Sequence, residues 1–430
     1  MINRITLLLF LGLAFGQSKM DINSLIDRGG VLYSPNKEKP FSGSVFDLYD
    51  NGQKKLNGRY RNGIKNGKWT WRYDDGGIDS TGNYKNGLMN GIWQFYDSNG
   101  NKKLEGQYKV GLMNGKMIWW YENGNKNGEG SYLNGDGTDK GNTGIPRNGR
   151  DGLWIFWYEN GQKDFEGTYK DGKENGLFTM RNENGEKKIE GTFKNGEENG
   201  KWTTWWSNGP KKSEGTFKDG KENGLFTWWY ENGKKELEVT FKDGKRISKT
   251  KWEWYENGQK KEEGTFKDGG KNGLWTEWYG NGQKKKERTY KDGKEVGLLT
   301  WWYENGKKEL EVTYKNGKRT GLRTEWYENG QKRKERTFKN GIEDGLRTEW
   351  NENGQKYRER TYKNGKMISK TNWEWYENGQ KKSEKTFKDG EENGKWTIWY
   401  ENQQKESEVT WKNGKLIFIK EWTEDGSVKK

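Results

Sequence analysis

Tryptophan is the residue type whose spacing in this chain most suggests binding chemistry. The most constant aromatic column of a repeated phrase consists of Trp205, Trp229, Trp254, Trp278, Trp302, Trp326, Trp350, Trp375 and Trp399. Such a column predicts one of two arrangements. Either the rings pack on one another and hold the fold together, or they form an exposed ladder that stacks on sugars or grips a repetitive polymer.

Catalytic chemistry has few residues to draw on. The chain has no Cys and no His, which excludes thiolate nucleophiles, imidazole bases, disulfides and the usual zinc sites. Ser248 and Lys251 match the S-x-x-K motif of penicillin-binding enzymes, but the chain has no Ser-Asp-Asn partner, and the equivalent stretch carries Asn372 in place of Lys251. A hydrolase would need one acid pair that differs from the others, and we find none. We therefore expect no enzyme, no catalytic residue, no metal and no cofactor.

The elements that must position the tryptophans are repeats. A turn glycine recurs every 24 residues, and the spacing slips to 25 residues at Gly258 and Gly379. A fixed period of this length is typical of stacked repeat architectures, in which each unit contacts only its neighbours.

Each repeat is predicted to be a β-hairpin. In one copy, residues 225–230 form a strand, Asn232-Gly233 makes a two-residue turn with φ > 0 at both positions, and residues 237–242 return. A wider turn begins at Asp243-Gly244.

This register makes a testable statement about faces. It sets Phe226 opposite Val239 and Trp228 opposite Leu237, with Leu225, Thr227 and Trp229 on the other face. The predicted fold class is all-β: an elongated single-layer antiparallel sheet of stacked hairpins of about 24 residues. With 28% hydrophobic residues but 26 Trp, 22 Tyr and 16 Phe, aromatic rings must supply the thin core.

The chain is predicted to have six segments. Residues 1–16 resemble a signal peptide, with Arg4 before the apolar run 5–15, and predict an exported protein. The alternatives are an uncleaved membrane anchor and an accidental apolar start. Residues 17–48 form a lead-in that caps the array, 49–134 a first block of repeats, 135–149 a loop insertion, 150–426 a second block and 427–430 a tail.

A longer copy is visible within the second block. The segment 247–254 returns at 368–375, an offset of 121 residues, which equals five repeats including one of 25 residues. We infer that a block of five repeats was duplicated, which favours a function shared among repeats over a single irreplaceable site.

The formal charge of +15 has two interpretations: a solvated mixed-charge surface, or attraction to anionic lipid headgroups, cell-wall polymers or nucleic acid. The basic residues are spread through every repeat, so the charge by itself selects no partner.

The segment Phe217-Lys218-Asp219-Gly220-Lys221-Glu222-Asn223-Gly224-Leu225-Phe226 resembles the MORN repeat. The whole 24-residue phrase is similar to the bacterial MORN-variant repeat of proteins often labelled YwqK-family antitoxins, over about residues 33–426. The resemblance implies elongated antiparallel sheets and scaffolding or membrane-associated roles. The antitoxin label implies a cytosolic toxin as partner, whereas an exported chain implies a partner in the envelope.

We expect a non-enzymatic exported protein that presents a protein-interaction or envelope-associated scaffold surface. One alternative is a cell-wall or polysaccharide-binding module that uses the aromatic ladder, as choline-binding repeats use Trp, Tyr and Gly at a similar period. The other is an antitoxin-like binding partner. The expected partner is a protein or an envelope polymer, with an anionic membrane surface as a further candidate; nucleic acid and a small-molecule substrate are not expected.

Overall fold

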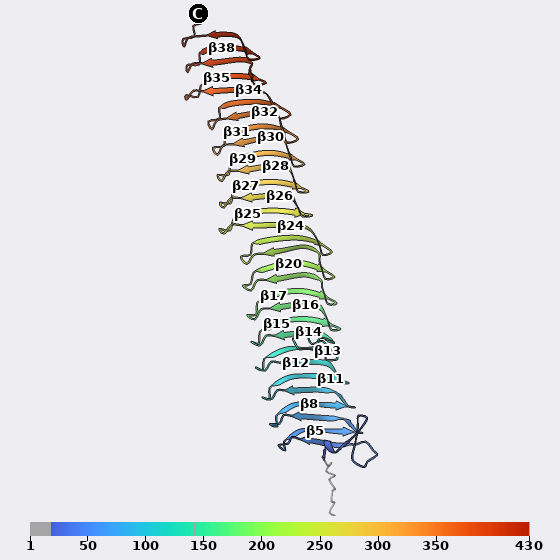
Figure 1. The fold of residues 1–430 in the computed structure, drawn as a ribbon. Coiled ribbons are helices and arrows are strands. Elements are labelled where there is room, and N and C mark those ends of the chain that lie inside the picture. Colours follow the sequence, from blue (N-terminus) through green and yellow to red (C-terminus); the bar gives the residue numbers. More distant parts are fainter. Residues whose placement is uncertain (1–18, 142, 430) are drawn as a thin grey trace, which may run out of the picture. The chain divides into compact units, whose positions relative to one another are not determined.

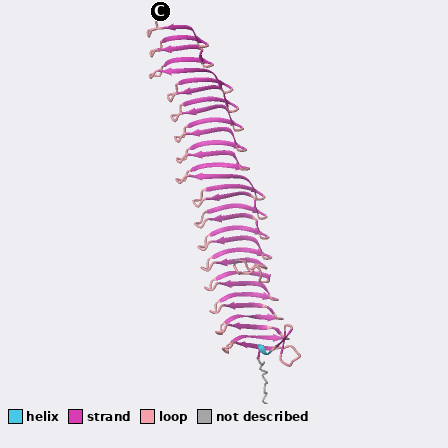
Figure 2. Ribbon diagram, in the orientation of Figure 1, coloured by secondary structure: helices cyan, strands magenta, loops and turns pink. Residues whose placement is uncertain are grey.

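The computed structural model describes residues 19–141 and 143–429, so the predicted signal peptide 1–16 lies outside the described residues. The described chain is almost entirely strands joined by short turns (Figures 1 and 2), with one three-residue 3-10 helix, η1 (Ile22–Ser24). None of its helical segments has the length and apolar character that a membrane-spanning helix requires.

The chain divides into two compact units. The first unit extends to Asn223 and includes Glu231–Gly233. Its strands are β1 (Met20–Asp21), β2 (Ile26–Arg28), β3 (Val31–Tyr33), β4 (Gly43–Leu48), β5 (Lys54–Arg61), β6 (Ile64–Lys65), β7 (Gly67–Arg72), β8 (Ile78–Lys85), β9 (Leu88–Met89), β10 (Gly91–Tyr96), β11 (Lys102–Lys109), β12 (Leu112–Trp120), β13 (Lys126–Gly135), β14 (Arg150–Trp157), β15 (Lys163–Lys170), β16 (Lys173–Arg181), β17 (Lys187–Lys194), β18 (Glu197–Glu198), β19 (Gly200–Trp205), β20 (Lys211–Lys218) and β21 (Lys221–Glu222).

The second unit holds Gly224–Tyr230 and Lys234–Lys430. Its strands are β22 (Gly224–Trp229), β23 (Lys235–Lys242), β24 (Lys245–Trp254), β25 (Lys260–Lys267), β26 (Gly270–Trp278), β27 (Lys284–Lys291), β28 (Lys294–Trp302), β29 (Lys308–Lys315), β30 (Lys318–Trp326), β31 (Lys332–Lys339), β32 (Ile342–Trp350), β33 (Lys356–Lys363), β34 (Lys366–Trp375), β35 (Lys381–Lys388), β36 (Glu391–Glu392), β37 (Gly394–Trp399), β38 (Lys405–Lys412) and β39 (Lys415–Glu421).

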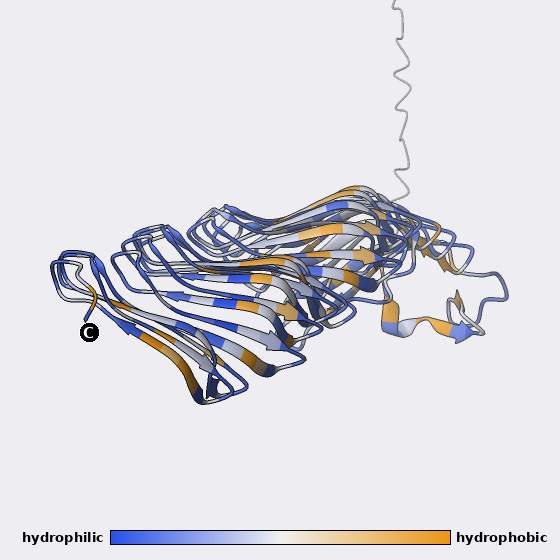
Figure 3. Ribbon diagram, turned by 90° about the horizontal axis from the view of Figure 1, so that it is seen from above, coloured by the Kyte–Doolittle hydropathy of each residue, from blue (hydrophilic) through white to orange (hydrophobic). Residues whose placement is uncertain are grey.

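Within each unit, successive hairpin strands pair antiparallel with the strands before and after them in the sequence. The N-terminal segment differs, because β1 pairs parallel with β4, and β2 and β3 form a separate hairpin. The predicted all-β architecture of stacked antiparallel hairpins is therefore confirmed in both units. Apolar and polar residues alternate along individual strands, as expected for a single-layer sheet (Figure 3).

The predicted register is confirmed, whereas the predicted turn types are wrong. Phe226 pairs with Val239 and Trp228 with Leu237. The tight two-residue turn, however, is Asp243-Gly244, where both residues have positive φ and Lys242 pairs with Lys245.

The Asn-Gly phrase instead forms a three-residue loop. Tyr255 N donates to Gln259 O at 2.9 Å, and only Gly258 takes a positive φ, of 89°. This is a type I turn followed by a left-handed glycine. The Asn257 side chain accepts a hydrogen bond from Gln259 N at 3.0 Å, which satisfies the loop without a left-handed Asn. A bulge where each loop begins, as between Trp228 and Trp229, restores the predicted register.

The core of the sheet lies on one face, which we call the core face. Its main column carries a large residue in the middle of each outgoing strand, and seven of these side chains are buried: Trp69, Trp93, Met117, Trp154, Phe226, Trp275 and Leu299. Many of these side chains cover a glycine of the preceding strand. A Cβ added to Gly82 would lie 2.2 Å from Trp93, so the rings fit against bare backbone.

The lead-in and the insertion both contact this core. Ile22, Leu25, Leu32 and Phe41 pack against the cluster that contains Val45 and Trp69. In the insertion, Ile145 is 2% exposed and joins the cluster of Trp154 and Phe156.

Candidate binding face

The nine predicted tryptophans occupy one structural position. Each is the last residue of its outgoing strand, in β19, β22, β24, β26, β28, β30, β32, β34 and β37, and each is half-buried. The structure therefore places them between the two predicted arrangements. They are neither the buried core, which is formed by the column that contains Trp275, nor fully exposed rings.

A lysine ammonium lies against most of these rings. The Nζ of Lys284 is 5.7 Å from the ring centroid of Trp302, and that of Lys260 is 5.4 Å from the ring of Trp278. Each lysine comes from the preceding repeat, so the cation–π contact links one hairpin to the next. The same lysines form ion pairs with the glutamate three residues later, as Lys260 does with Glu263 at 2.8 Å.

The turns beside these tryptophans are tied from repeat to repeat. The hydroxyl of Tyr279 donates to the carbonyl oxygen of Trp302 at 2.9 Å, and Asn281 Nδ2 donates to Glu304 O at 2.9 Å. The equivalent bonds recur along the array, for example from Tyr303 to Trp326 O at 2.7 Å. These bonds use backbone carbonyls that the hairpin ladder leaves unpaired, and they fix the spacing of the rings.

An exposed leucine column shares the face of the lysines and glutamates. Leu274, Leu298 and Leu322 are 50–55% exposed, and Leu274 lies two residues from Thr276, the cross-strand partner of Glu287. Because side chains alternate along a strand, Leu274, Thr276 and Trp278 point to one side, which we call the ladder face. Glu287 lies opposite Thr276 on this face, and the bulge between Glu277 and Trp278 pairs Trp278 with Lys284 and so brings the lysine to the same side. Leu225 was predicted to share the face of Trp229, but no binding role was predicted for these leucines, although their recurrence opposite the core column was a usable signal.

The ladder face carries paired charges of both signs. The hydrogen bond from Lys211 lowers the pKa of Glu214 below its ordinary value, with a second contribution from Lys201. Lys395 and Lys405 lower the pKa of Glu408 in the same way. The glutamates are thus ionised at neutral pH, and the face presents ion pairs with an apolar column between them instead of a uniformly basic surface.

The two 25-residue repeats interrupt this pattern. Here the indole Nε1 of Trp254 donates to Lys235 O at 2.8 Å, and that of Trp375 to Lys356 O at 2.6 Å. A cavity of about 480 Å³ adjoins Trp375 and is lined by Gly354, Gln355, Lys356, Trp373, Lys381 and Glu384.

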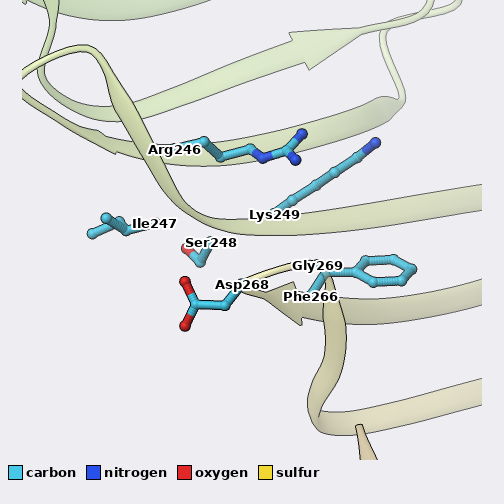
Figure 4. A pocket seen from close by; sticks show the side chains of 7 residues that line it. All are labelled: Arg246, Ile247, Ser248, Lys249, Phe266, Asp268 and Gly269. Carbon is cyan, nitrogen blue, oxygen red and sulfur yellow. The ribbon is translucent and has the colours of Figure 1, made fainter. Parts of the chain in front are cut away.

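The S-x-x-K residues are not brought together. Ser248 and Lys251 pair with Thr240 and Leu237 across the strand, so their side chains point to opposite faces. Lys251 Nζ forms an ion pair with Glu253 at 2.7 Å. Ser248 and Lys249 both line a cavity of about 320 Å³, but Ser248 lies toward Asp268 whereas Lys249 extends to the other side of its strand (Figure 4).

In the insertion, the carboxylate of Asp136 is hydrogen-bonded to neighbouring residues of the same loop. Asp136 accepts hydrogen bonds from the backbone and hydroxyl of Thr138 and from Asn148 Nδ2. Within residues 19–141 and 143–429, no three Asp or Glu side chains gather as a metal site would require.

Stacked hairpins whose side chains recur from copy to copy define a β-repeat protein with two periodic faces. The MORN repeat variant profile matches eleven segments, which together cover more than half of the chain: 65–86, 89–109, 113–134, 150–171, 222–243, 253–268, 271–292, 295–316, 319–340, 343–364 and 374–389. The chain belongs to the MORN repeat variant family.

A comparison with curated proteins found no match. Among solved structures, a complex titled TcdB2-TccC3-Cdc42 is similar, with 10% identity and a TM-score of 0.17, covering 90% of this chain and 26% of that one. A Photorhabdus luminescens Tc holotoxin pore is similar with 11% identity and a TM-score of 0.19, covering 88% of this chain and 24% of that one. This chain thus spans about a quarter of the length of the solved chains it matches.

Proposed function

We propose that this chain is a non-enzymatic, exported scaffold whose ladder face binds a protein or an envelope polymer. The observation that carries the proposal is the recurrence, in most repeats of the second unit, of a half-buried Trp, its Lys–Glu ion pair and an exposed Leu. Trp is among the side chains that most often supply binding energy at interfaces, and the exposed leucines add apolar area beside the rings. Identical copies at a fixed spacing add avidity for a repetitive partner.

The proposal of export rests on Arg4 and the apolar run that follows it. N-terminal sequencing of natively expressed protein should then begin near Gln17. If an intact chain starting at Met1 in the cytosol is the sole product, export is refuted, and the antitoxin alternative, which needs a cytosolic partner, gains support.

The ladder face can be tested by graded removal. Leu298→Ser, Leu322→Ser and Leu346→Ser change one exposed residue in each of three successive repeats, and they should weaken capture of native envelope material stepwise. The matched control is Lys291→Ser, Lys315→Ser and Lys339→Ser, which changes exposed residues at the tight turns of the same repeats. If the leucine series binds as well as the control series, the ladder face is not the binding surface.

The polysaccharide alternative has one specific observation in its favour. The cavity beside Trp375 combines two indole rings with Gln355, Lys356 and Glu384, a mixture of stacking and hydrogen-bonding groups suited to a sugar. Quenching of Trp fluorescence by glycan fragments, lost in Trp375→Leu, would support it. A signal that persists in this variant would argue against a sugar at this cavity.

A further inference from the structure

The core face changes character in the second unit. From β30 to β34 the aromatic column gives way to a row of cations: Arg323, Arg336, Arg347, Arg360 and Lys370. Each of these residues pairs directly with the next across the strands. Like charges in direct cross-strand positions are destabilising unless something compensates them.

Carboxylates compensate the first three cations. Arg336 Nη2 lies 2.6 Å from Glu325, which also pairs with Arg323 at 2.9 Å. Arg347 binds Glu349 through Nη2 at 2.6 Å and Nε at 3.0 Å.

The compensation ends at β33. Arg358 and Arg360 reach only the second oxygen of Glu349, at 3.7 Å each, and that oxygen makes no hydrogen bond. Within the described part of the chain, no carboxylate lies within ion-pairing distance of Lys370. The buried Nε of Arg358 and the buried Oδ1 of Asn372, its cross-strand partner, also have no hydrogen-bond partner.

The cations at this end of the row are therefore in surplus and partly desolvated. Arg360 is only 16% exposed and Arg358 36% exposed. Burial lowers the pKa of Lys370, and the charges of Arg358 and Arg360 lower it further. A cavity of about 160 Å³ opens beside Lys370 and is lined by Met367, Ser369, Phe387 and Gly390.

We propose that Arg358, Arg360 and Lys370 form a binding site for one phosphate or sulfate group. A doubly charged oxyanion would neutralise the surplus and accept hydrogen bonds from the guanidinium and ammonium groups, among them the unpaired Nε–H of Arg358. Arginine binds such groups through two parallel N–H donors, and lysine adds a point charge. The site lies on the core face and is separate from the ladder face.

The chain contains a matched site without the arginines. In the duplicated block, 121 residues earlier, Lys249 and Phe266 occupy the positions of Lys370 and Phe387, but Leu237 and Val239 replace Arg358 and Arg360. Figure 4 shows the cavity of this copy, with Lys249 on the same side as Phe266. Replacing Arg358 by Leu and Arg360 by Val therefore introduces residues that the equivalent hairpin of this chain already carries.

The test is calorimetric titration of the full chain with inorganic phosphate and with sulfate, at constant ionic strength. The wild type should bind one anion per chain. The double variant Arg358→Leu/Arg360→Val should fold and bind at least tenfold more weakly, whereas the reverse graft Leu237→Arg/Val239→Arg should raise the stoichiometry to two. Equal affinity in the wild type and in the first double variant would overturn the site.

Two further arms complete the test. Vesicles that contain phosphatidic acid test whether a lipid headgroup phosphate enters the site. Vesicle binding that depends on Arg358 and Arg360 would identify the bound phosphate as part of a lipid. Binding of the free anions without vesicle binding would identify it as part of a soluble ligand. If the double variant fails to fold, Lys370→Gln should weaken anion binding in the same titration, and an unchanged affinity would again refute the proposal.

Discussion

The indole ring of Trp275 packs directly on the backbone of Gly264, its cross-strand partner in the preceding strand. A Cβ added at Gly264 would stand 2.1 Å from Trp275 Cε3, closer than two carbon atoms can approach. In this repeat the ring of one hairpin therefore packs on the bare backbone of the preceding hairpin.

Gly264→Ala should destabilise the second unit by about 1–3 kcal/mol, because the ring must leave its rotamer or the strands must separate. Urea unfolding monitored by circular dichroism measures the change. The matched control is Gly280→Ala, where an added Cβ would meet nothing within 4 Å and φ is not positive. This control should be neutral or slightly stabilising. Equal midpoints for the two variants would show that the Gly264–Trp275 contact is not tight.

The two tryptophan columns should respond differently to truncation. Trp275, 5% exposed, is expected to lose roughly 3–5 kcal/mol on replacement by Ala. Trp302 is half-buried and should lose only about 1–2 kcal/mol, while its loss weakens partner binding. Unfolding and envelope capture, measured on both variants, separate the structural role from the binding role. If Trp302→Ala lost more stability than Trp275→Ala, the column of Trp302 would be structural, not a binding surface.

The hydrogen bond from Tyr279 to the carbonyl of Trp302 should stabilise the contact between successive repeats. Tyr279→Phe keeps the ring and removes the donor, and we expect a loss of about 1 kcal/mol. Hydrogen exchange should quicken around the loops of these two repeats and stay unchanged several repeats away, since each repeat contacts only its neighbours. Uniformly faster exchange throughout the unit would contradict this local role.

Deleting residues 247–367 should leave a folded chain, because it removes 121 residues between equivalent positions. In the product, Lys370 follows a strand that carries Leu237 and Val239, the neighbours that Lys249 has in the intact chain. We expect strand content by circular dichroism to persist, ladder-face binding to fall in proportion to the repeats removed, and phosphate binding to disappear. Failure to fold, or complete loss of ladder-face binding, would point to a unique site within the deleted block.

Lowering the pH should destabilise the fold around the row of cations, because Glu349 loses its charge. Burial by itself would raise the pKa of Glu349, but the hydrogen bond and charge of Arg347, with the charges of Arg360 and Lys334, lower it below the ordinary value of 4.5. A carboxyl with a lowered folded-state pKa stabilises the fold above its unfolded pKa, and this stabilisation is lost as the pH falls through the folded value.

Glu349→Gln makes this loss measurable. It should cost about 3 kcal/mol at pH 7, since one partner of a buried ion pair is removed. The difference from wild type should begin to shrink below the ordinary pKa of 4.5, where the unfolded chain binds the proton, and should vanish as the pH falls through the lower pKa of the folded state. A difference that stays constant between pH 7 and pH 3 would show that the Glu349 charge does not stabilise this region.

The 24-residue period, the hairpins and their pairing were predictable from the sequence. The alternation of apolar and polar residues allows only one register that keeps Phe226 and Val239 on the core face. The turn types could not be predicted. Asn-Gly and Asp-Gly both tolerate positive φ, and the choice depends on contacts between repeats, such as the bond of 2.6 Å from Asn257 Nδ2 to Gly280 O.

For the candidate sites, too, part was predictable from the sequence and part depended on tertiary contacts. The sequence by itself determined that a Trp recurs in nine successive repeats from Trp205 to Trp399, because the repeat period is a property of the chain. Only the tertiary structure decided that these rings are half-buried against lysines of the preceding repeat. Likewise, Arg347, Arg360 and Lys370 stand apart in the sequence, in three different strands, and become one row of cations because cross-strand pairing places them side by side.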